Sequence, residues 1–173
     1  LHGDYVTTER LVLEASLVRG GRTVSTINFL NDAVIHKGSF SRPIRLDMEI
    51  DGNFLSSFTG DGLIVSTPTG STAYSLSAGG PIITPTQAEI VLLSPVCPHS
   101  LAMRPMIIPA ASIFRARVNA EYSNLLLTID GQEVITINGN DEVVIRTSNK
   151  NIKLIIHPEK NYYAILREKL GWG

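Results

Sequence analysis

The residues best suited to chemistry form one continuous run, from Asp61 to Ser75. An aspartate opens the run, a short apolar segment follows at 63–65, and a corner containing Pro68 and Gly70 leads into closely spaced Ser and Thr residues and a tyrosine. Capping a helix would use one or two of these hydroxyls, each contributing about 1 kcal/mol. The excess of hydroxyl groups predicts that this run is one wall of a polar small-molecule site.

The order of residue types in the run also predicts its local structure. The apolar segment 63–65 predicts a buried strand, Pro68 ends it, and Gly70 permits a sharp turn. Ser71 or Thr72 then fits the N-cap of a short helix that ends near residue 78, with its free N–H groups facing the site. At the other end of the strand, the carboxylate of Asp61 can accept hydrogen bonds from sugar or amide groups.

Most of the remaining chain predicts strands and tight turns. Residues 44–50 alternate strictly between apolar and charged side chains, and residues 11–17 alternate in a similar way. Two helices are predicted, one beginning near residue 71 and one after Pro158, with an apolar stripe of Tyr162, Ile165, Leu166 and Leu170. We therefore expect a mainly β, sandwich-like single domain over residues 1–173, with roughly ten short strands and two short helices.

Composition excludes several classes of function. The chain has 15 basic and 16 acidic residues, so no basic patch predicts nucleic-acid binding. No apolar run approaches the roughly 18 residues of a membrane span. The single cysteine, Cys97, excludes an internal disulfide and favours a reducing, cytoplasmic setting, and we expect it to be structural rather than catalytic. The four histidines lack the spacing of a metal site, so no metal ligand is predicted.

The central run, extended to Pro81, resembles the bacterial NAD kinases. Further elements share the resemblance, namely 31–36, 98–101, 104–105 and 170–172. The family transfers the terminal phosphate of ATP, or of polyphosphate, to the 2′-hydroxyl of the adenosine ribose of NAD, which gives NADP. The resemblance implies the β-rich, NAD-binding C-terminal domain of an architecture shared with diacylglycerol kinases. The family's N-terminal α/β domain, with its Gly-Gly-Asp-Gly segment, is expected outside this chain.

The resemblance also implies roles for individual residues. The catalytic base belongs to the Gly-Gly-Asp-Gly segment, so no catalytic residue is expected in this chain, and the chain alone is expected to be inactive. Asp61 follows Thr59-Gly60 and mimics that segment, but its position assigns it to substrate contact. The implied NAD contacts are Asn31, Asp32, Arg42, Asp61, Thr72, Ala73, Tyr74, Ser75, Ser77 and Gln132.

The resemblance further implies ligands and partners. Asn31 and Asp32 are expected near the accepting ribose, although most relatives have Glu at the second position. Mg²⁺ is expected to arrive with ATP, held by phosphates. A homodimer or homotetramer is expected, and the segment 94–109 is a candidate interface or, equally, a loop that covers the core.

Other interpretations stay open on the sequence. A lipid kinase of the diacylglycerol or sphingosine type would need an apolar pocket over the same corner. A non-catalytic β-sandwich binding module is the third interpretation. Taken residue by residue, Asn31-Asp32 also fits a strand-end turn, Tyr74 a core position and Arg42 a solvated loop.

Overall fold

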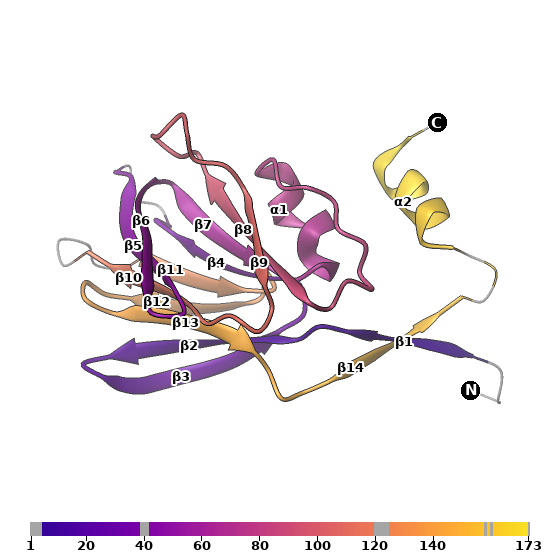
Figure 1. Cartoon of the computed structure of the whole chain (residues 1–173), viewed down its shortest axis with the longest axis horizontal. Helices are drawn as coiled ribbons and strands as arrows, with labels where there is room; N and C mark the ends of the chain where they lie inside the picture. Colours follow the sequence, from indigo (N-terminus) through magenta and orange to yellow (C-terminus); the bar gives the residue numbers. More distant parts are fainter. Residues whose placement is uncertain (1–4, 39–41, 120–124, 158, 160, 173) are drawn as a thin grey trace.

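The computed structural model of the chain shows two six-stranded antiparallel sheets packed face to face, and a separate two-stranded ribbon (Figure 1). The structure describes residues 5–38, 42–119, 125–157, 159 and 161–172. The ribbon extends away from the two sheets and leads to the C-terminal helix (Figure 1). The prediction of a mainly β, sandwich-like domain with two short helices is therefore confirmed.

The first sheet has the order β3-β2-β13-β10-β5-β6. Its strands are β2 (Leu13–Arg19), β3 (Arg22–Phe29), β5 (Ile44–Ile50), β6 (Asn53–Gly60), β10 (Phe114–Val118) and β13 (Glu142–Thr147). The predicted tight turn between β2 and β3 is present, because Gly20 and Gly21 have φ angles of 56° and 77°. The regular alternation of residues 44–50 forms β5 as expected.

The second sheet has the order β12-β11-β4-β7-β8-β9. Its strands are β4 (Asp32–His36), β7 (Gly62–Ser66), β8 (Ile90–Val96), β9 (Met106–Pro109), β11 (Leu125–Ile129) and β12 (Glu133–Ile137). The ribbon pairs β1 (Val6–Arg10) with β14 (Ile152–Ile156). The sequence predicts neither β1, β4 nor β9, so the described residues hold more strands than expected.

The core lies between the two sheets, where the inward side chains of both meet. Alternate residues of β2 and β11 face inward. In β11 these are Leu125, Leu127 and Ile129, and none of them is more than 2% exposed. The largest fully buried side chains include Phe29, Phe58 and Phe114, all from the first sheet. Such burial contributes about 25 cal/mol for each square ångström of apolar surface removed from water, which makes this core the main source of stability.

The corner after β7 differs from its prediction in one respect. A single 3₁₀ turn, η1 (Thr69–Thr72), precedes the short helix α1 (Tyr74–Ser77), and Ala73 occupies the N-cap without any side-chain cap. The prediction that Ser71 or Thr72 caps the helix is wrong. The Ser71 hydroxyl is instead buried, where it contacts the carbonyls of Pro68 and Ile83 and accepts a hydrogen bond from the Ile83 N–H. It therefore ties the corner to the returning chain.

The second predicted helix is α2 (Tyr162–Leu170). Asn161 caps its start by accepting a hydrogen bond from the Ala164 N–H at 2.9 Å, and Gly171, with φ of 66°, ends it. Of the predicted apolar stripe only Leu166 is fully buried, while 45% of Ile165 is exposed. Among the described residues, no helix is long and apolar enough to cross a bilayer.

We expect the leucine-to-alanine substitution Leu127→Ala to lower the free energy of unfolding by about 2–5 kcal/mol, because it leaves a cavity in the fully buried core. Val24→Ala is the control, since Val24 is 51% exposed, and we expect a change within about 0.5 kcal/mol. Urea unfolding followed by circular dichroism measures both. Equal losses in the two variants would contradict the placement of the core.

Candidate functional site

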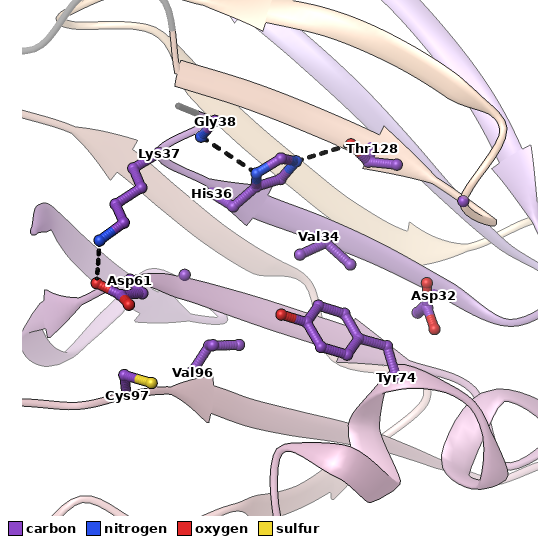
Figure 2. Close-up of a pocket in the computed structure, with 12 residues that line it drawn as sticks. Asp32, Val34, His36, Lys37, Gly38, Asp61, Tyr74, Val96, Cys97 and Thr128 are labelled. Carbon is purple, nitrogen blue, oxygen red and sulfur yellow. Dashed lines mark hydrogen bonds and ion pairs between the residues drawn. The ribbon is translucent and has the colours of Figure 1, made fainter. Parts of the chain in front are cut away.

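The site is built on the outer face of the second sheet, on the side away from the core. Side chains alternate between the two faces of a strand. Ala33 and Ile35 of β4 point into the core and are fully buried, so Asp32, Val34 and His36 point outward. These three side chains lie along β4 and line one side of a cavity (Figure 2).

The cavity has a volume of about 680 Å³ and draws its lining from several elements of the second sheet and from α1. Tyr74, at the start of α1, extends its ring over the strands (Figure 2). The lining residues are Asp32, Val34, His36, Lys37, Gly38, Asp61, Gly62, Tyr74, Val96, Cys97, Thr128 and Gly131. The cavity therefore combines an apolar centre with charged groups at both ends, the usual make-up of a small-molecule site.

A single carboxylate fixes the entry into β4. One oxygen of Asp130 accepts hydrogen bonds from the N–H groups of Asn31 and Asp32, at 2.7 and 3.0 Å, and the other accepts from Leu30 at 2.9 Å. The Asp130 N–H in turn donates to the Asp32 carbonyl at 2.9 Å. Asp130 has a positive φ of 48° at the head of the turn between β11 and β12, which aims its side chain back along the sheet. We call this set of contacts the Asp130 clamp.

The corner holds the same segment from the other side. Thr67 donates its N–H to the Asn31 carbonyl at 2.9 Å and its hydroxyl to the Leu30 carbonyl. Gly70 lies so close that a Cβ there would collide with the Asn31 backbone. Only glycine fits this approach, which explains the glycine at the corner better than turn geometry does. Asn31 and Asp32 are thus fixed through their backbone groups, so their side chains are not needed to hold this segment in place.

Asp32 is an unusual carboxyl group. It is 5% exposed, and its pKa rises from 3.8 to about 6, first because burial disfavours the charge and second because the Asp130 charge repels it. The Tyr74 N–H at the start of α1 opposes this rise by hydrogen bonding to the carboxylate. Asp32 therefore changes its charge within a range where a bound ligand can alter its protonation.

His36 is held as one neutral tautomer. The Gly38 N–H donates to its Nδ1 at 3.2 Å, so Nδ1 carries no proton. Its Nε2–H then donates to the Thr128 hydroxyl at 2.8 Å across the strand pair (Figure 2). Burial lowers the pKa of His36, which keeps the ring uncharged at neutral pH. The ring presents a rigid, neutral edge to the middle of the cavity.

The far end of the cavity carries an ion pair. Lys37 Nζ lies 2.7 Å from Asp61 Oδ1, and the two side chains are 24% and 37% exposed (Figure 2). The hydrogen bond from Lys37 is the main cause that lowers the pKa of Asp61, and the Cys97 thiol and the charge of His99 act in the same direction. Asp61 is therefore ionised and already has a partner, so it can accept hydrogen bonds but is not placed to remove a proton.

The structure separates the predicted contact residues into groups. Asp32, Asp61 and Tyr74 line the large cavity, while Asn31 and Thr72 line a second, smaller cavity of about 290 Å³. Ala73 connects η1 to α1 between them. The roles of all these residues as NAD contacts stay predictions.

The other predicted contacts do not line either cavity. Ser75 is fully buried and its hydroxyl lies 2.8 Å from that of Ser94, which gives it a structural partner. Arg42 and Ser77 are exposed. Gln132 is also exposed, and it follows Gly131, which does line the large cavity.

Among the lining residues that sequence reasoning missed are three with polar side chains, His36, Lys37 and Thr128. A period of two was the available signal, because His36 lies four residues after Asp32 and hence on the same face of a strand. It was missed because 32–36 was taken as a motif and not as a strand. Across the described ranges, no cluster of three or more His, Cys, Asp or Glu side chains is placed to hold a metal ion.

The fold and the cavity define a β-sandwich domain with a candidate small-molecule site, apolar at its centre and charged at both ends, on the outside of one sheet. Residues 30–157 match the family described as the ATP-NAD kinase C-terminal domain. The chain belongs to this family, as the resemblance predicted.

Curated relatives agree with this assignment. The chain is 42% identical, over its full length, to the NAD kinase of Geotalea daltonii, of which it covers 61%. It is 40% identical, again over its full length, to the NAD kinase of Natranaerobius thermophilus, of which it covers 60%. The chain thus spans about three fifths of the length of these relatives.

Solved structures share the fold. The yeast NADH kinase complexed with NADH superimposes with a TM-score of 0.89 and 33% identity, covering 96% of this chain and 49% of that one. The NAD kinase from Archaeoglobus fulgidus in complex with ATP superimposes with a TM-score of 0.77 at 21% identity, covering 96% of this chain and 61% of that one, and shows the fold alone.

We expect Asp32 to leave a mark on the pH dependence of stability. Because folding raises its pKa from 3.8 to about 6, the native state binds the proton more tightly, and Asp32 destabilises the fold progressively as the pH rises through this window. The stability of Asp32→Asn relative to the unmodified chain should therefore increase between about pH 4 and pH 6 and stay level above. Urea unfolding at a series of pH values measures it, and a difference that is constant with pH would contradict the raised pKa.

Proposed function

We propose that this chain is the NAD-binding part of an NAD kinase, which transfers the terminal phosphate of ATP to the 2′-hydroxyl of the adenosine ribose of NAD to give NADP. One observation carries the proposal: Asp32, Asp61 and Tyr74, predicted from the sequence as NAD contacts, converge on one cavity from β4, from the turn between β6 and β7, and from α1. Family membership and the whole-chain likeness to NAD kinases support it.

The cavity offers suitable groups for the ribose, the rings and the amide of the dinucleotide. The Asp32 carboxylate accepts hydrogen bonds from ribose hydroxyls, and Asn31 lies beside it on the next cavity. The Tyr74 ring is 48% exposed and offers a face on which a base or nicotinamide ring can pack. At the far end, the Lys37–Asp61 pair provides a donor and an acceptor for an amide group.

In the proposed reaction this chain presents the acceptor and does not activate it. A carboxylate base outside the chain takes the proton of the 2′-hydroxyl, the oxygen bonds to the terminal phosphorus, and the bond from that phosphorus to the bridging oxygen breaks to release ADP. Positioning and charge stabilisation dominate such transfers. Two of the described carboxylates fit this division, because Asp61 is paired with Lys37 and Asp130 is occupied by backbone N–H groups.

Mg²⁺ belongs to the proposal as a companion of ATP. The ion prefers phosphate and water oxygens and few carboxylates, and the described residues offer no ligand cluster of their own. When bound, it would neutralise charge on the phosphate chain. Polyphosphate in place of ATP would bring the ion in the same way.

The charged groups in the cavity lining favour this function over a lipid kinase. A lipid kinase would require an apolar acceptor pocket, whereas two aspartates, a histidine and a lysine line this one. A non-catalytic β-sandwich module would bind a ligand without turnover. Only the activity of the whole protein distinguishes the two: an NAD kinase forms NADP, and a binding module does not.

The test is a calorimetric titration of the purified chain with NAD and, separately, with diacylglycerol micelles. We expect NAD to bind and the lipid not to bind. Tyr74→Ala should weaken NAD binding by about tenfold, the loss of one aromatic packing contact. Tyr5→Ala is the matched control, because Tyr5 is 51% exposed and lines neither cavity.

Two results would contradict the proposal: lipid binding without NAD binding, or NAD binding that Tyr5→Ala and Tyr74→Ala weaken equally. The chain alone is proposed to be inactive because the base lies outside it. NADP formation from ATP and NAD by the purified 173-residue chain would contradict that part.

A homodimer or homotetramer is a further part of the proposal. The candidate interface segment 94–109 exposes apolar side chains, with Leu101 92%, Ile107 50% and Met106 40% exposed. Analytical ultracentrifugation should show a dimer or tetramer, and Leu101→Asp should shift it toward monomer. A chain that sediments as a monomer at every concentration, with or without the substitution, would contradict an assembly through this segment.

We also place the protein in the cytoplasm, because Cys97 is free and exposed and such a thiol is kept reduced there. Cell fractionation that recovers the protein outside the cytoplasm would overturn this placement.

A further inference from the structure

The second cavity, of about 290 Å³, lies beyond the corner, on the other side of the Asn31-Asp32 step from the large one. It is enclosed by the ribbon, η1 and α2, three elements far apart in the sequence. Arg10 enters it from β1, Thr69 and Thr72 from η1, and Tyr162 and Lys169 from α2. These residues share a capacity to donate hydrogen bonds.

Three residues that line this cavity carry a buried polar atom without a hydrogen-bond partner. Within the described part of the chain, the buried side-chain nitrogen and oxygen atoms without a partner are Arg10 Nε, Thr69 Oγ1 and Tyr162 Oη. All three residues line this cavity, and Arg10 and Tyr162 also line a neighbouring cavity of about 390 Å³. Folded proteins rarely leave such atoms unsatisfied, because each costs the free energy of its lost hydration. Three in one place indicate a missing common partner. Since Arg10 Nε–H only donates, that partner must accept hydrogen bonds.

The charge of the cavity indicates what kind of acceptor fits. Arg10 and Lys169 are its charged lining residues, and no acidic side chain among the described residues lines it. Lys169 is held in place by the Thr72 carbonyl and hydroxyl, each at 3.2 Å, and the Arg10 guanidinium by the Thr8 hydroxyl at 2.7 Å. Two fixed cations with three free donors suit an anion with several oxygens, such as a phosphate chain.

Neighbouring residues of the chain line the two cavities. Asn31 lines the small cavity and Asp32 the large one, and Thr72 and Tyr74 are divided in the same way across the corner. An acceptor ribose bound in the large cavity beside Asp32 would lie next to Asn31 and hence close to the small cavity. In-line transfer places the incoming phosphorus there, about 3–3.5 Å from the attacking oxygen.

We propose that the small cavity binds the phosphate chain of the phosphoryl donor, with Arg10 and Lys169 as the binding cations and the hydroxyls of Thr69 and Tyr162 as donors. The proposal rests on the proposed NAD kinase function for the identity of the donor, but the site itself is defined by its own residues. It assigns this chain a share of the donor site as well as of the acceptor site.

The test is calorimetric titration of the 173-residue chain with inorganic tripolyphosphate, without NAD. We expect binding, and we expect Arg10→Gln and Lys169→Gln each to weaken it by about tenfold, the effect of losing one charge-assisted hydrogen bond. Arg22→Gln is the control with the same loss of charge, because Arg22 lies at the start of β3 and lines neither cavity.

Two isosteric substitutions separate binding from a structural role. Thr69→Val and Tyr162→Phe each remove an unsatisfied hydroxyl. They should therefore leave the melting temperature of the free chain unchanged or raised, and still weaken tripolyphosphate binding. A hydroxyl with a merely structural role would give the reverse, a lower melting temperature and unchanged binding.

Absence of tripolyphosphate binding overturns the proposal, and so does binding that Arg22→Gln weakens as much as Arg10→Gln does. If NAD binds the chain but tripolyphosphate does not, the donor site fails while the proposed function stands. If tripolyphosphate binds through Arg10 and Lys169 but NAD does not bind, the anion site stands and the proposed function fails.

Discussion

The site depends on one carboxylate, that of Asp130, which gathers the N–H groups of three consecutive residues at the entry to β4. Charge-assisted hydrogen bonds of this kind are stronger than those between neutral groups, and here they replace the water that these N–H groups would lose on burial. Because the backbone is fixed, Asn31 and Asp32 direct their side chains into different cavities. Burial raises the pKa of Asp32, and the Asp130 charge adds to this rise, so the carboxylate that fixes the geometry also contributes to the electrostatics of the acceptor site.

Some hydroxyls of the corner stabilise its structure, and others line a cavity. Thr67 and Ser75 use their hydroxyls to hold the corner against the entry to β4 and against β8, and Ser71 ties it to Ile83. Thr69 and Thr72 instead line the small cavity. Gly70 lets the corner pack directly against the Asn31 backbone, beside the point where the chain passes from the lining of one cavity to that of the other.

The sequence was sufficient for the fold class because strict alternation, as in residues 44–50, has only one structural meaning. It also located the corner and the three residues that converge on the large cavity. It failed where long-range contacts decide the outcome. The Asp130 clamp joins residues 100 positions apart, and the small cavity joins β1 to α2, so neither has a local signal. Ser71 was expected to cap a helix, but a tertiary contact with Ile83 competes successfully for its hydroxyl.

The central claim is that the dinucleotide lies on the outer face of the second sheet, with its adenosine ribose at the step between the two cavities. A crystal structure of the chain with NAD bound tests it directly. The account predicts a ribose hydroxyl within hydrogen-bond distance of Asp32 and a ring of the ligand against Tyr74. A structure with NAD bound elsewhere, and with Asp32 and Tyr74 free of contact, would contradict it.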